Sequence, residues 1–480
     1  MKKQTPLATI PQKTTVLIVG GGIVGAGIFR DLSLHDIPTI LIDKKDFSSQ
    51  TSQSSSKMLH GGIRYLENFD FKLIWEALHE KNLWLKIAPH LCRDCSFYLP
   101  AFKESKRPLW MLKIGLMLYD LLSSYQNTPH KMLNSVQTVQ KIPTLKSRSL
   151  SGSGVYHDAL VDDAKMTIDV ILDGQENKLN HALNYVGLID LKHCGEYSEA
   201  TLEDSLTGER KTIRATEVVF ATGPFTDKLL KKFPEFQWTD KLIPSKGSHI
   251  WLKKTALPLT DAMLLQTKDD RVIFVIPQKG AILVGTTEVP VDRDLFDAKP
   301  TQQEIDYLLQ VVNEYFPQSQ LGHDAILSSF AGIRPLVKEG DENDLGKTAR
   351  EHKTYQPFSN VHVIVGGKYT TFRVMGQEIS RIITHRCHKA YNPNRTKQVL
   401  RYQSKISCFA EATTITPELI MEIVKNEQVR TFQDLIRRRL SLPGVAHWQQ
   451  QIPFAEFFIK LLPQLNEYFP VTAEEINHYK

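Results

Sequence analysis

The sequence has few cysteines, no long apolar run and no large excess of either charge. Five cysteines in 480 residues are too few and too scattered for a disulfide framework, which favours a reducing compartment. No segment reaches the roughly 20 apolar residues that a membrane-spanning helix needs, and the first residues lack the apolar stretch of a secretory signal. These absences predict an intracellular protein that does not span a membrane.

The charge and composition exclude other classes of protein. The formal net charge of +6 is mild for this length and suits anionic metabolites or anionic lipid as well as nucleic acid, so charge alone selects no partner. Nothing else in the sequence indicates a nucleic-acid partner. With 41% hydrophobic and 23% charged residues the chain has the balance of a folded globular protein, and it is long enough for two or three domains. The oligomeric state is left open, a homodimer included.

A strand, a glycine-rich turn and a helix form the first clear pattern. Residues 15–19 (TVLIV) predict a buried strand, and helical spacing follows the turn. Between them Gly20, Gly22 and Gly25 stand as GxGxxG, which allows a tight turn, close approach of a pyrophosphate and close packing of helix on strand. This arrangement predicts a dinucleotide site.

A carboxylate completes that predicted site. A second apolar run, residues 39–42, ends at Asp43, which lies 23 residues after Gly20 (43 minus 20). There it can accept hydrogen bonds from a ribose diol, and its charge disfavours the 2′-phosphate of NADP. The whole unit is the βαβ start of a doubly wound sheet.

A second glycine-lined helix start lies near residue 366. Gly366 and Gly367 follow a predicted strand at 361–365 and precede a helix that runs to residue 383. The positive end of such a helix stabilises the negative charge that a flavin ring acquires on reduction. Two separated nucleotide-contacting segments favour a large bound FAD over a diffusing NAD.

The chain between and beyond these segments changes character several times. We expect a Ser-rich loop at 47–57, a helix at 70–88 and a polar surface connection at 123–153, followed by strands at 218–221, 248–253, 271–277 and 281–285. The last two strands flank Gln278, Lys279 and Gly280, which is a hairpin signal. Helices are expected at 417–426, 431–440 and 455–462. The pattern predicts a nucleotide-binding domain, a mostly antiparallel second domain and a helical C-terminal domain.

Seven further motifs occur along the chain: TSQSSSKMLHGGIRYLENFDFKLIWEAL from Thr51, KGSH from Lys246, GTTE from Gly285, AGIRPL from Ala331, REH from Arg350, GGKYTTFR from Gly366 and VRTFQDLIRRRL from Val429. They resemble the motifs of one known family, the FAD-dependent, quinone-linked glycerol-3-phosphate dehydrogenases. Their order and spacing also match, and the likeness runs from about Thr15 to at least Leu440.

The resemblance implies a fold and domain boundaries. The fold is α/β, with a Rossmann-like FAD-binding domain, an inserted mainly antiparallel β substrate domain of the D-amino-acid oxidase type and a C-terminal helical domain. We expect one oxidoreductase module at 14–390 and the helical domain at 395–480. Within the module the FAD-binding parts are expected at about 14–100, 150–225 and 355–390, and the substrate parts at about 100–150 and 226–354.

The resemblance also implies an activity. It is hydride transfer from C2 of sn-glycerol 3-phosphate to FAD, which gives dihydroxyacetone phosphate, followed by electron delivery to a membrane quinone. The implied location is the cytoplasmic face of the inner membrane, as a peripheral protein on an anionic surface, with a soluble fraction. The alternatives are an oxidase that uses oxygen and a non-catalytic FAD-binding membrane protein.

Each implied site residue falls inside one of the matching motifs. A phosphate dianion needs fixed cations and neutral donors, and the resemblance assigns these roles to Arg64, Tyr65, Arg350, Lys368 and Thr370. It places Arg334 at the reacting end of the substrate. Besides the glycines of both turns and Asp43, it assigns the cofactor contacts to Ser52, Ser56, Lys57, Gly61 and Gly223. No metal site is expected.

Two histidines are candidates for the base that takes the proton of the C2 hydroxyl. A histidine accepts a proton near neutral pH. His249 lies on a predicted strand of the substrate domain and is the favoured base, whereas His60 lies in the loop expected to line the flavin, where a structural role is equally reasonable.

Three positions depart from the family pattern, and one cysteine pair has a second interpretation as a redox or metal site. Phe220, Phe225 and Glu288 replace a common Asn, Trp and Asp, and none of these changes removes a charge from the expected phosphate site. Cys92 and Cys95 form a single CxxC, which we interpret as core packing.

Two basic segments are possible lipid contacts. Residues 103–122 combine Lys103, Lys106, Arg107 and Lys113 with a Trp and several aliphatic residues, and either a membrane face or a core helix fits this composition. The run Arg437–Arg439 offers a second contact, although such runs are more often solvated.

Overall fold

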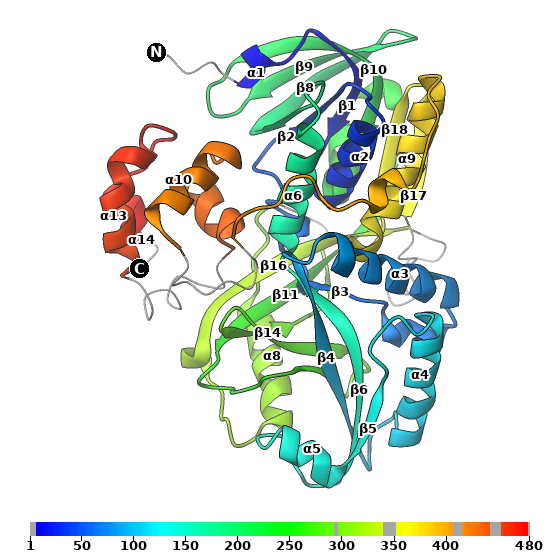
Figure 1. The fold of residues 1–480 in the computed structure, drawn as a ribbon, viewed down its shortest axis with the longest axis vertical. Coiled ribbons are helices and arrows are strands. Elements are labelled where there is room, and N and C mark those ends of the chain that lie inside the picture. The colour runs from blue at the N-terminus through cyan, green and yellow to red at the C-terminus, as the bar shows by residue number, and fades with distance from the viewer. Residues whose placement is uncertain (1–5, 292–295, 339–351, 407–414, 442–452, 479–480) are drawn as a thin grey trace.

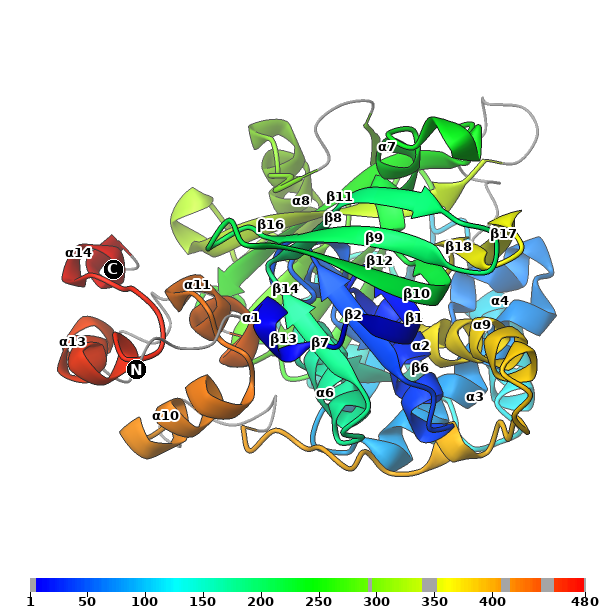
Figure 2. The ribbon, with the colours of Figure 1, turned by 90° about the horizontal axis from the view of Figure 1, so that it is seen from above.

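The computed structural model describes residues 6–291, 296–338, 352–406, 415–441 and 453–478. The chain forms two β-sheets with associated helices and a separate group of C-terminal helices. In Figure 1 the first sheet lies at the top, the second at the bottom and the C-terminal helices at the left; Figure 2 shows the same arrangement from above.

The first sheet has a parallel centre, as the βαβ pattern predicts. Its strands, in spatial order, are β17 (His352–Phe358), β18 (Val361–Gly366), β10 (Arg210–Phe220), β1 (Lys13–Val19), β2 (Thr39–Asp43) and β7 (His181–Asn184). All neighbours from β18 to β7 run parallel, and β17 is antiparallel to β18. Parallel strands of this kind are apolar throughout because both faces of the sheet are covered.

Different elements cover the two faces of this sheet. Helices α2 (Ile23–Leu34), α6 (Asp163–Gln175) and α9 (Phe372–Arg386) form one core with it. On the opposite face the antiparallel strands β8 (Val186–His193) and β9 (Ser198–Asp204), which continue from β10, form a second core together with the short helices α1 (Pro6–Thr9) and α7 (Thr226–Leu230).

The second sheet is mainly antiparallel. Its strands, in spatial order, are β15 (Val289–Pro290), β11 (Leu242–Lys253), β14 (Ala281–Gly285), β13 (Val272–Gln278), β12 (Ala262–Gln266), β4 (Cys92–Phe102), β6 (Leu150–Val161) and β3 (Met58–Leu59), with β16 (Ile326–Val337) beside β11 and β5 (Lys131–Asn134) beside β6. The predicted hairpin is confirmed: β13 and β14 pair around Lys279 and Gly280, both with positive φ. Helix α8 (Gln302–Tyr315) packs on this sheet and begins with a Thr301–Glu304 capping box.

Two sequence expectations are corrected here. Residues 92–100 and 150–161, expected in the FAD-binding part, form most of β4 and β6 and pair in the second sheet, although Cys92, Ala159 and Val161 pack in the core of the first sheet. The polar segment 123–153 is not only a connection, because it holds β5, α5 (Ser135–Lys141) and the start of β6. These elements are too short to show a period, and backbone pairing with β6 and an Asn134–Gln137 capping box stabilise them.

Three of the C-terminal helical segments match the predicted ones, and a fourth, α14 (Ala473–His478), was not predicted. The segments are α10 (Pro417–Asn426), α11 with the π-helical turn after it (Phe432–Asp434 and Leu435–Arg439), α13 (Phe454–Leu465) and α14, around a core of their own. Of the arginine run, only Arg437 is exposed. Arg438 and Arg439 are buried and both pair with Asp46 of the first domain. The expectation that this run contacts lipid is therefore wrong for two of its three residues, because a distant buried acid binds them.

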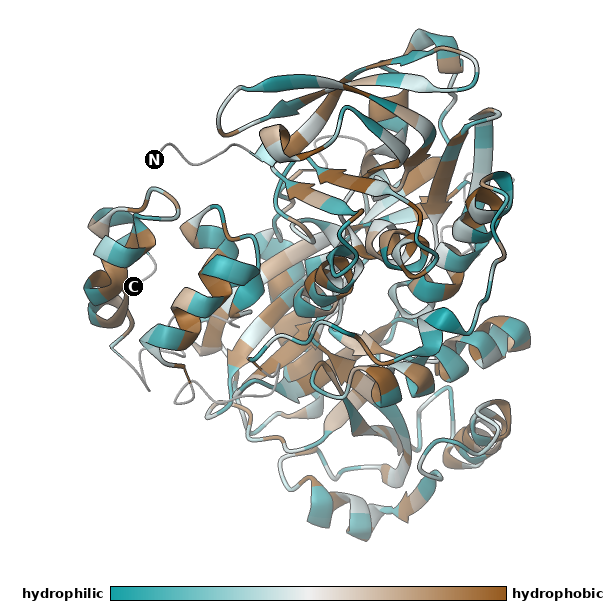
Figure 3. Ribbon diagram, turned by 45° about the horizontal axis from the view of Figure 1, so that its top comes forward, coloured by the Kyte–Doolittle hydropathy of each residue, from teal (hydrophilic) through white to brown (hydrophobic). Residues whose placement is uncertain are grey.

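Helices α3 (Phe71–Ile87) and α4 (Leu109–Leu122) pack together at the right of Figure 1. One face of α4 is buried through Leu112, Leu116 and Tyr119, whereas Trp110 (66% exposed) and Ile114 (57%) lie on the outer side. Figure 3 shows α4 as one of the most apolar helices of the molecule. None of the helices in the described part of the chain has the length and apolar character needed to cross a bilayer.

The CxxC pair lies at the start of β4. Cys92 is buried in the core of the first domain, and burial raises the pKa of the Cys95 thiol to about 11. A thiol with such a pKa is poorly reactive at neutral pH, which agrees with the interpretation of this pair as core packing.

Candidate cofactor and substrate site

The glycine-rich turn follows β1 and opens α2, as predicted. Gly20 has φ +115°, and a Cβ there would lie 2.4 Å from the Ala221 carbonyl oxygen. A Cβ on Gly25 would lie 1.9 Å from the Gly20 carbonyl oxygen, so this glycine permits the close packing of helix on turn. The N-cap residue Gly22 provides no side-chain cap, and the first helical N–H, that of Ile23, donates to Ser52 Oγ. The turn thus presents backbone N–H groups at the positive end of a helix, which is the usual geometry for a pyrophosphate.

Asp43 is held at the end of β2 beside this turn. Its carboxylate accepts hydrogen bonds from the backbone N–H groups of Gly21 (2.7 Å) and Lys45 (2.9 Å). Burial raises the pKa of Asp43 to about 7, although these two hydrogen bonds lower it. A hydroxyl donor would relieve the unfavourable desolvation of this carboxylate, which fits the predicted contact with a ribose.

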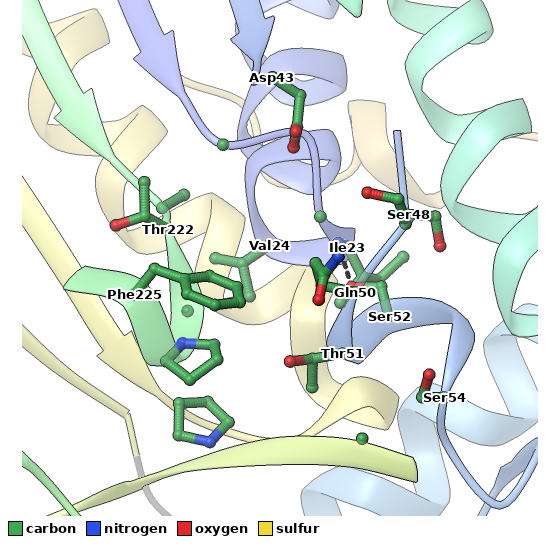
Figure 4. A pocket seen from close by; sticks show the side chains of 18 of the residues that line it. Ile23, Val24, Asp43, Ser48, Gln50, Thr51, Ser52, Ser54, Thr222 and Phe225 are labelled. Atoms are coloured by element: carbon green, nitrogen blue, oxygen red, sulfur yellow. Dashed lines mark hydrogen bonds between the residues drawn. The ribbon is translucent and has the colours of Figure 1, made fainter. Parts of the chain in front are cut away.

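A cavity of about 780 Å³ extends from this turn to the second sheet. Figure 4 shows Asp43 at one end, Thr222 and Phe225 on one side and Ser48, Gln50 and Ser52 on the other, with the Ile23 N–H donating to Ser52 Oγ (2.9 Å). The predicted residues that line the cavity are Gly20, Gly22, Asp43, Ser52, Ser56, His60, Tyr65, Gly223, His249, Arg334, Gly366, Gly367, Lys368 and Thr370. One continuous space therefore joins the predicted cofactor and substrate residues.

Five predicted residues are not in that lining. Gly25 lies behind the turn, and Gly61 lies against Tyr119. Lys57 is buried and donates to Asp163 Oδ1 (2.6 Å) and the Gln53 carbonyl (2.9 Å). Arg64 is exposed beside Tyr65, and Arg350 lies outside the described residues.

His249 occupies a tight position on β11. Its ring stacks on Phe330 with centroids 4.9 Å apart and lies directly over Gly285, where a Cβ would be 2.1 Å from the ring. Its Nε2 is 3.0 Å from Ser56 Oγ, and its buried Nδ1 has no hydrogen-bond partner among the described residues. Burial, together with the charges of Arg334 and Lys57, holds the pKa of His249 well below its usual value. The ring is therefore neutral at pH 7 and able to accept a proton.

Arg334 reaches the same cavity from β16. Its guanidinium donates to Thr286 Oγ1 (2.9 Å) and to the Thr287 carbonyl (3.4 Å), and Glu288 lies 3.8 Å away. These contacts fix the planar group beside His249. The acid that replaces the family's common Asp at position 288 thus remains in contact with this arginine.

A cationic end of the cavity surrounds Tyr65. Lys368 Nζ lies 3.8 Å from the centre of its ring, and the Arg64 guanidinium carbon lies 5.5 Å away. Thr370 Oγ1 accepts from the His60 backbone N–H at 3.3 Å. Lys368, a phenol and a hydroxyl line this end of the cavity, and Arg64 lies outside the lining beside Tyr65; this set of groups is suitable for a small dianion.

Sequence reasoning missed part of the lining. Val186, Gly187 and Leu188 at the start of β8 line the cavity near Asp43. Phe296 also lines it and stacks on Phe225 at 4.0 Å. No local motif marks these positions, because tertiary packing alone brings them to the cavity. Together with the glycine turn they provide an elongated site that fits the nucleotide half and the flavin half of an FAD.

Comparisons with known proteins agree with this geometry. The family described as FAD dependent oxidoreductase (DAO) matches residues 15–381. The aerobic glycerol-3-phosphate dehydrogenase of Staphylococcus haemolyticus (strain JCSC1435) is 34% identical over 382 residues, 78% of this chain and 68% of that protein. The corresponding protein of Staphylococcus aureus (strain MRSA252) is 33% identical over 380 residues, with the same coverage.

Solved structures show the same fold. The glycerol-3-phosphate dehydrogenase of Bacillus halodurans complexed with FAD superposes with a TM-score of 0.74 at 23% identity, over 98% of this chain and 93% of that one. The L-α-glycerophosphate oxidase of Mycoplasma pneumoniae with FAD bound gives 0.62 at 18% identity, over 81% of this chain and 98% of that one. Both superpositions show the same fold, and the first covers nearly the full length of this chain.

Proposed function

The chain belongs to the FAD-dependent glycerol-3-phosphate dehydrogenases of the FAD-dependent oxidoreductase family, and from this premise we propose that it oxidises sn-glycerol 3-phosphate and passes the electrons to a membrane quinone. The observation that carries the proposal is the pairing of a cationic end at Tyr65 with a neutral histidine and an arginine in one cavity. Such a site suits a small phosphate ester with an oxidisable hydroxyl.

The cationic end selects the substrate. Lys368 and Arg64 would bind the phosphate, with Tyr65 and Thr370 as neutral donors. Glycerol and a hydroxy acid such as malate lack that phosphate group. Because hydrogen bonds to charged groups contribute about 1.5–3 kcal/mol each, losing them weakens binding of these analogues strongly.

The other end performs the chemistry. His249, whose ring is neutral before the reaction, is the proposed acceptor of the C2 hydroxyl proton, although its lowered pKa makes it a weaker base than an ordinary histidine. Arg334 binds the developing oxyanion at C2. FAD, when bound, accepts the hydride from C2. The C2–H bond and the O–H bond break, the C2=O bond forms, and dihydroxyacetone phosphate leaves.

A quinone acceptor requires access to a membrane, and an exposed apolar face supports it. The members of this face, here named the α3–α4 face, are Phe69, Phe71, Trp75, Trp110, Met111, Ile114, Met117, Leu121 and Tyr125. Contiguous exposed apolar side chains of this kind mark interaction surfaces. Exposed Lys72, Lys103 and Lys113 lie among them, so the face combines apolar insertion with attraction to anionic lipid. We therefore propose attachment to an anionic membrane surface, and the family resemblance implies that this surface is the cytoplasmic face of the inner membrane.

Not all of the expected basic residues contribute to this face. Lys106 pairs with Asp270, and Arg107 pairs with Glu67. The face is nevertheless close to the cavity in the sequence. Residues 60–69 connect His60, in the cavity lining, to Phe69, on the face.

Anaerobic reduction of the bound flavin tests the activity. We expect sn-glycerol 3-phosphate to bleach the oxidised-flavin absorbance, and glycerol and malate to leave it unchanged. Lys368→Met should raise the concentration of sn-glycerol 3-phosphate that gives half-maximal bleaching about 10- to 100-fold, as the loss of one charged hydrogen bond predicts. Lys353→Met, on neighbouring β17 and outside the cavity lining, is the matched control. A flavin that malate bleaches equally well would refute the proposed substrate.

The acceptor is tested separately on the reduced protein. We expect a short-chain quinone to reoxidise the flavin faster than air-saturated buffer does. Faster reoxidation by oxygen would identify an oxidase. This alternative is retained because the Mycoplasma pneumoniae oxidase has the same fold. Bound FAD that no substrate reduces would indicate the non-catalytic alternative.

A further inference from the structure

A short loop carries much of the proposed substrate site. Residues 60–65, here named the substrate-side loop, place His60 and Tyr65 in the cavity lining and Arg64 beside Tyr65. Within it, Gly62 has φ +78° and the Tyr65 ring packs on it, so the conformation of the loop sets where Tyr65 lies. Whatever holds the loop backbone in place therefore also places the phosphate-binding end.

One buried hydroxyl holds the centre of this loop. The Gly61 N–H donates to Tyr119 Oη at 2.9 Å, and Tyr119 donates in turn to Asp158 Oδ2 at 2.9 Å. Asp158 Oδ1 is also 3.4 Å from the Gly61 nitrogen. A Cβ on residue 61 would lie 2.5 Å from Tyr119 Oη, so the loop packs directly on the hydroxyl.

This contact joins elements that are distant in the sequence. Tyr119 is on the buried side of α4, Asp158 on β6 and Lys81 on α3, with Lys81 Nζ 3.8 Å from Asp158 Oδ1. All three side chains are buried. Burial raises the pKa of Asp158 to about 7 and that of Tyr119 well above its usual value. A buried acid in an otherwise apolar core is unfavourable, and here its hydrogen-bonding partners lead to a loop of the site.

We infer that Tyr119 and Asp158 are positioning residues that hold the substrate-side loop through the Gly61 amide and thereby set the affinity for the phosphate ester. The inference rests on the proposed function for its substrate. Neither side chain lines the cavity, so both act through the loop. A purely structural pair would change the stability of the protein and leave substrate affinity unchanged.

Tyr119→Phe separates these two roles, because it keeps the ring and removes only the hydroxyl. We expect the KM for sn-glycerol 3-phosphate to rise about tenfold, as the loss of one hydrogen bond predicts, and kcat to stay within about twofold because His249 and Arg334 lie on other elements. FAD content should not change. Asp158→Asn retains an acceptor for Tyr119 and should raise KM less, by about threefold.

Tyr156→Phe is the matched control. Tyr156 is equally buried, its ring centroid lies 5.6 Å from that of Tyr119, and among the described residues its hydroxyl has no hydrogen bond to the loop. We expect the KM of this variant to match that of the wild type. Equal KM values for Tyr119→Phe and the wild type, or equal changes in both tyrosine variants, would overturn the inference.

Amide hydrogen exchange of the peptide spanning residues 58–66 provides a readout that does not depend on turnover. In Tyr119→Phe this peptide should exchange about tenfold faster, with peptides of β1 and β2 unchanged. Unchanged exchange of residues 58–66 would refute the anchoring role. A wild-type protein that does not oxidise sn-glycerol 3-phosphate would refute the proposed function instead, so the two failures are distinguishable.

Discussion

Residues 103–122 and the run Arg437–Arg439 look alike in the sequence, since each places basic residues beside large apolar ones, yet they lie in opposite environments. On α4 the outer side chains Trp110, Ile114 and Met117 are exposed, and exposed Lys103 and Lys113 accompany them. Arg439 is fully buried and pairs with Asp46.

The difference arises from what each segment meets after folding. Arg438 and Arg439 both reach Asp46, in the loop that leads from β2 to the serines of the cavity lining. Burial alone raises the pKa of Asp46, but the charges of Arg439 and Arg438 overcome this and hold the pKa at about 2. The run thus attaches the C-terminal helices to the cofactor domain. No acid meets Lys103 or Lys113 among the described ion pairs, so α4 retains an exposed basic and apolar surface.

Removing the buried acid should have the largest effect. Asp46→Ala leaves two buried arginines without their shared partner, and breaking a buried pair in this way costs about 3–5 kcal/mol. We expect the free energy of unfolding in urea to fall by that amount and FAD to dissociate more readily. Asp297→Ala, which removes an exposed pair with Lys45, should change stability by less than about 1 kcal/mol.

The same ion pair predicts a pH dependence. Because the pKa of Asp46 is about 2 in the folded protein and 3.8 normally, its contribution is fully present above about pH 4 and is lost as pH falls towards 2. Urea unfolding of the wild type and of Asp46→Ala between pH 6 and pH 3 measures this contribution as the difference between their free energies of unfolding. A stability difference that is constant from pH 6 to about pH 5 and decreases by pH 3 agrees with this pKa, whereas a difference already lost by pH 5 would contradict it.

Removing apolar side chains from α4 should have the next largest effect, on membrane binding and not on stability. Each large side chain inserted into lipid contributes about 1.5 kcal/mol, so Ile114→Gln with Met117→Gln should weaken pelleting with phosphatidylglycerol vesicles about 100-fold. Leu179→Gln with Leu206→Gln, which changes two exposed apolar residues outside α3, α4 and the cavity lining, is the control. Unchanged pelleting of the α4 variant would exclude the α3–α4 face.

Neutralising the lysines of this face should have a smaller effect. Each basic residue near an anionic surface contributes about 1 kcal/mol, so Lys103→Gln with Lys113→Gln should weaken pelleting roughly 30-fold at low salt, and the difference should shrink in high salt. Lys178→Gln with Lys254→Gln changes the net charge equally at exposed sites elsewhere. An equal loss in both variants would mean that total charge, and not this face, determines binding.

The smallest effect is expected at Arg437. It is the exposed member of its run, and surface substitutions of this kind change stability by no more than about 0.5 kcal/mol. Arg437→Gln should therefore keep both the melting temperature and the vesicle pelleting of the wild type. A loss of pelleting would show that the C-terminal run contacts lipid after all.

Local patterns predicted the parts of the site that local geometry builds. Gly20, Gly22 and Asp43 line the cavity as the βαβ pattern requires, and the second glycine pair lies opposite them. The same reasoning did not show that β4 and β6 pair in the second sheet, because strand pairing depends on partners that the sequence does not reveal. It also overlooked Tyr119 and Asp158. A tyrosine in an apolar helix and an acid in a strand give no indication in the sequence that they lie beside the Gly61 N–H.

The sequence by itself determined the glycine turns, the alternation of strands and helices and the order of the family motifs, because each depends on residues close together in the chain. Tertiary structure alone decided which charges are buried and which are exposed. Asp46 binds Arg439 from 393 positions away, Lys106 meets Asp270, and burial together with the charges of Arg334 and Lys57 lowers the pKa of His249. Desolvation and ion pairing act through space, and only the folded chain brings such partners together.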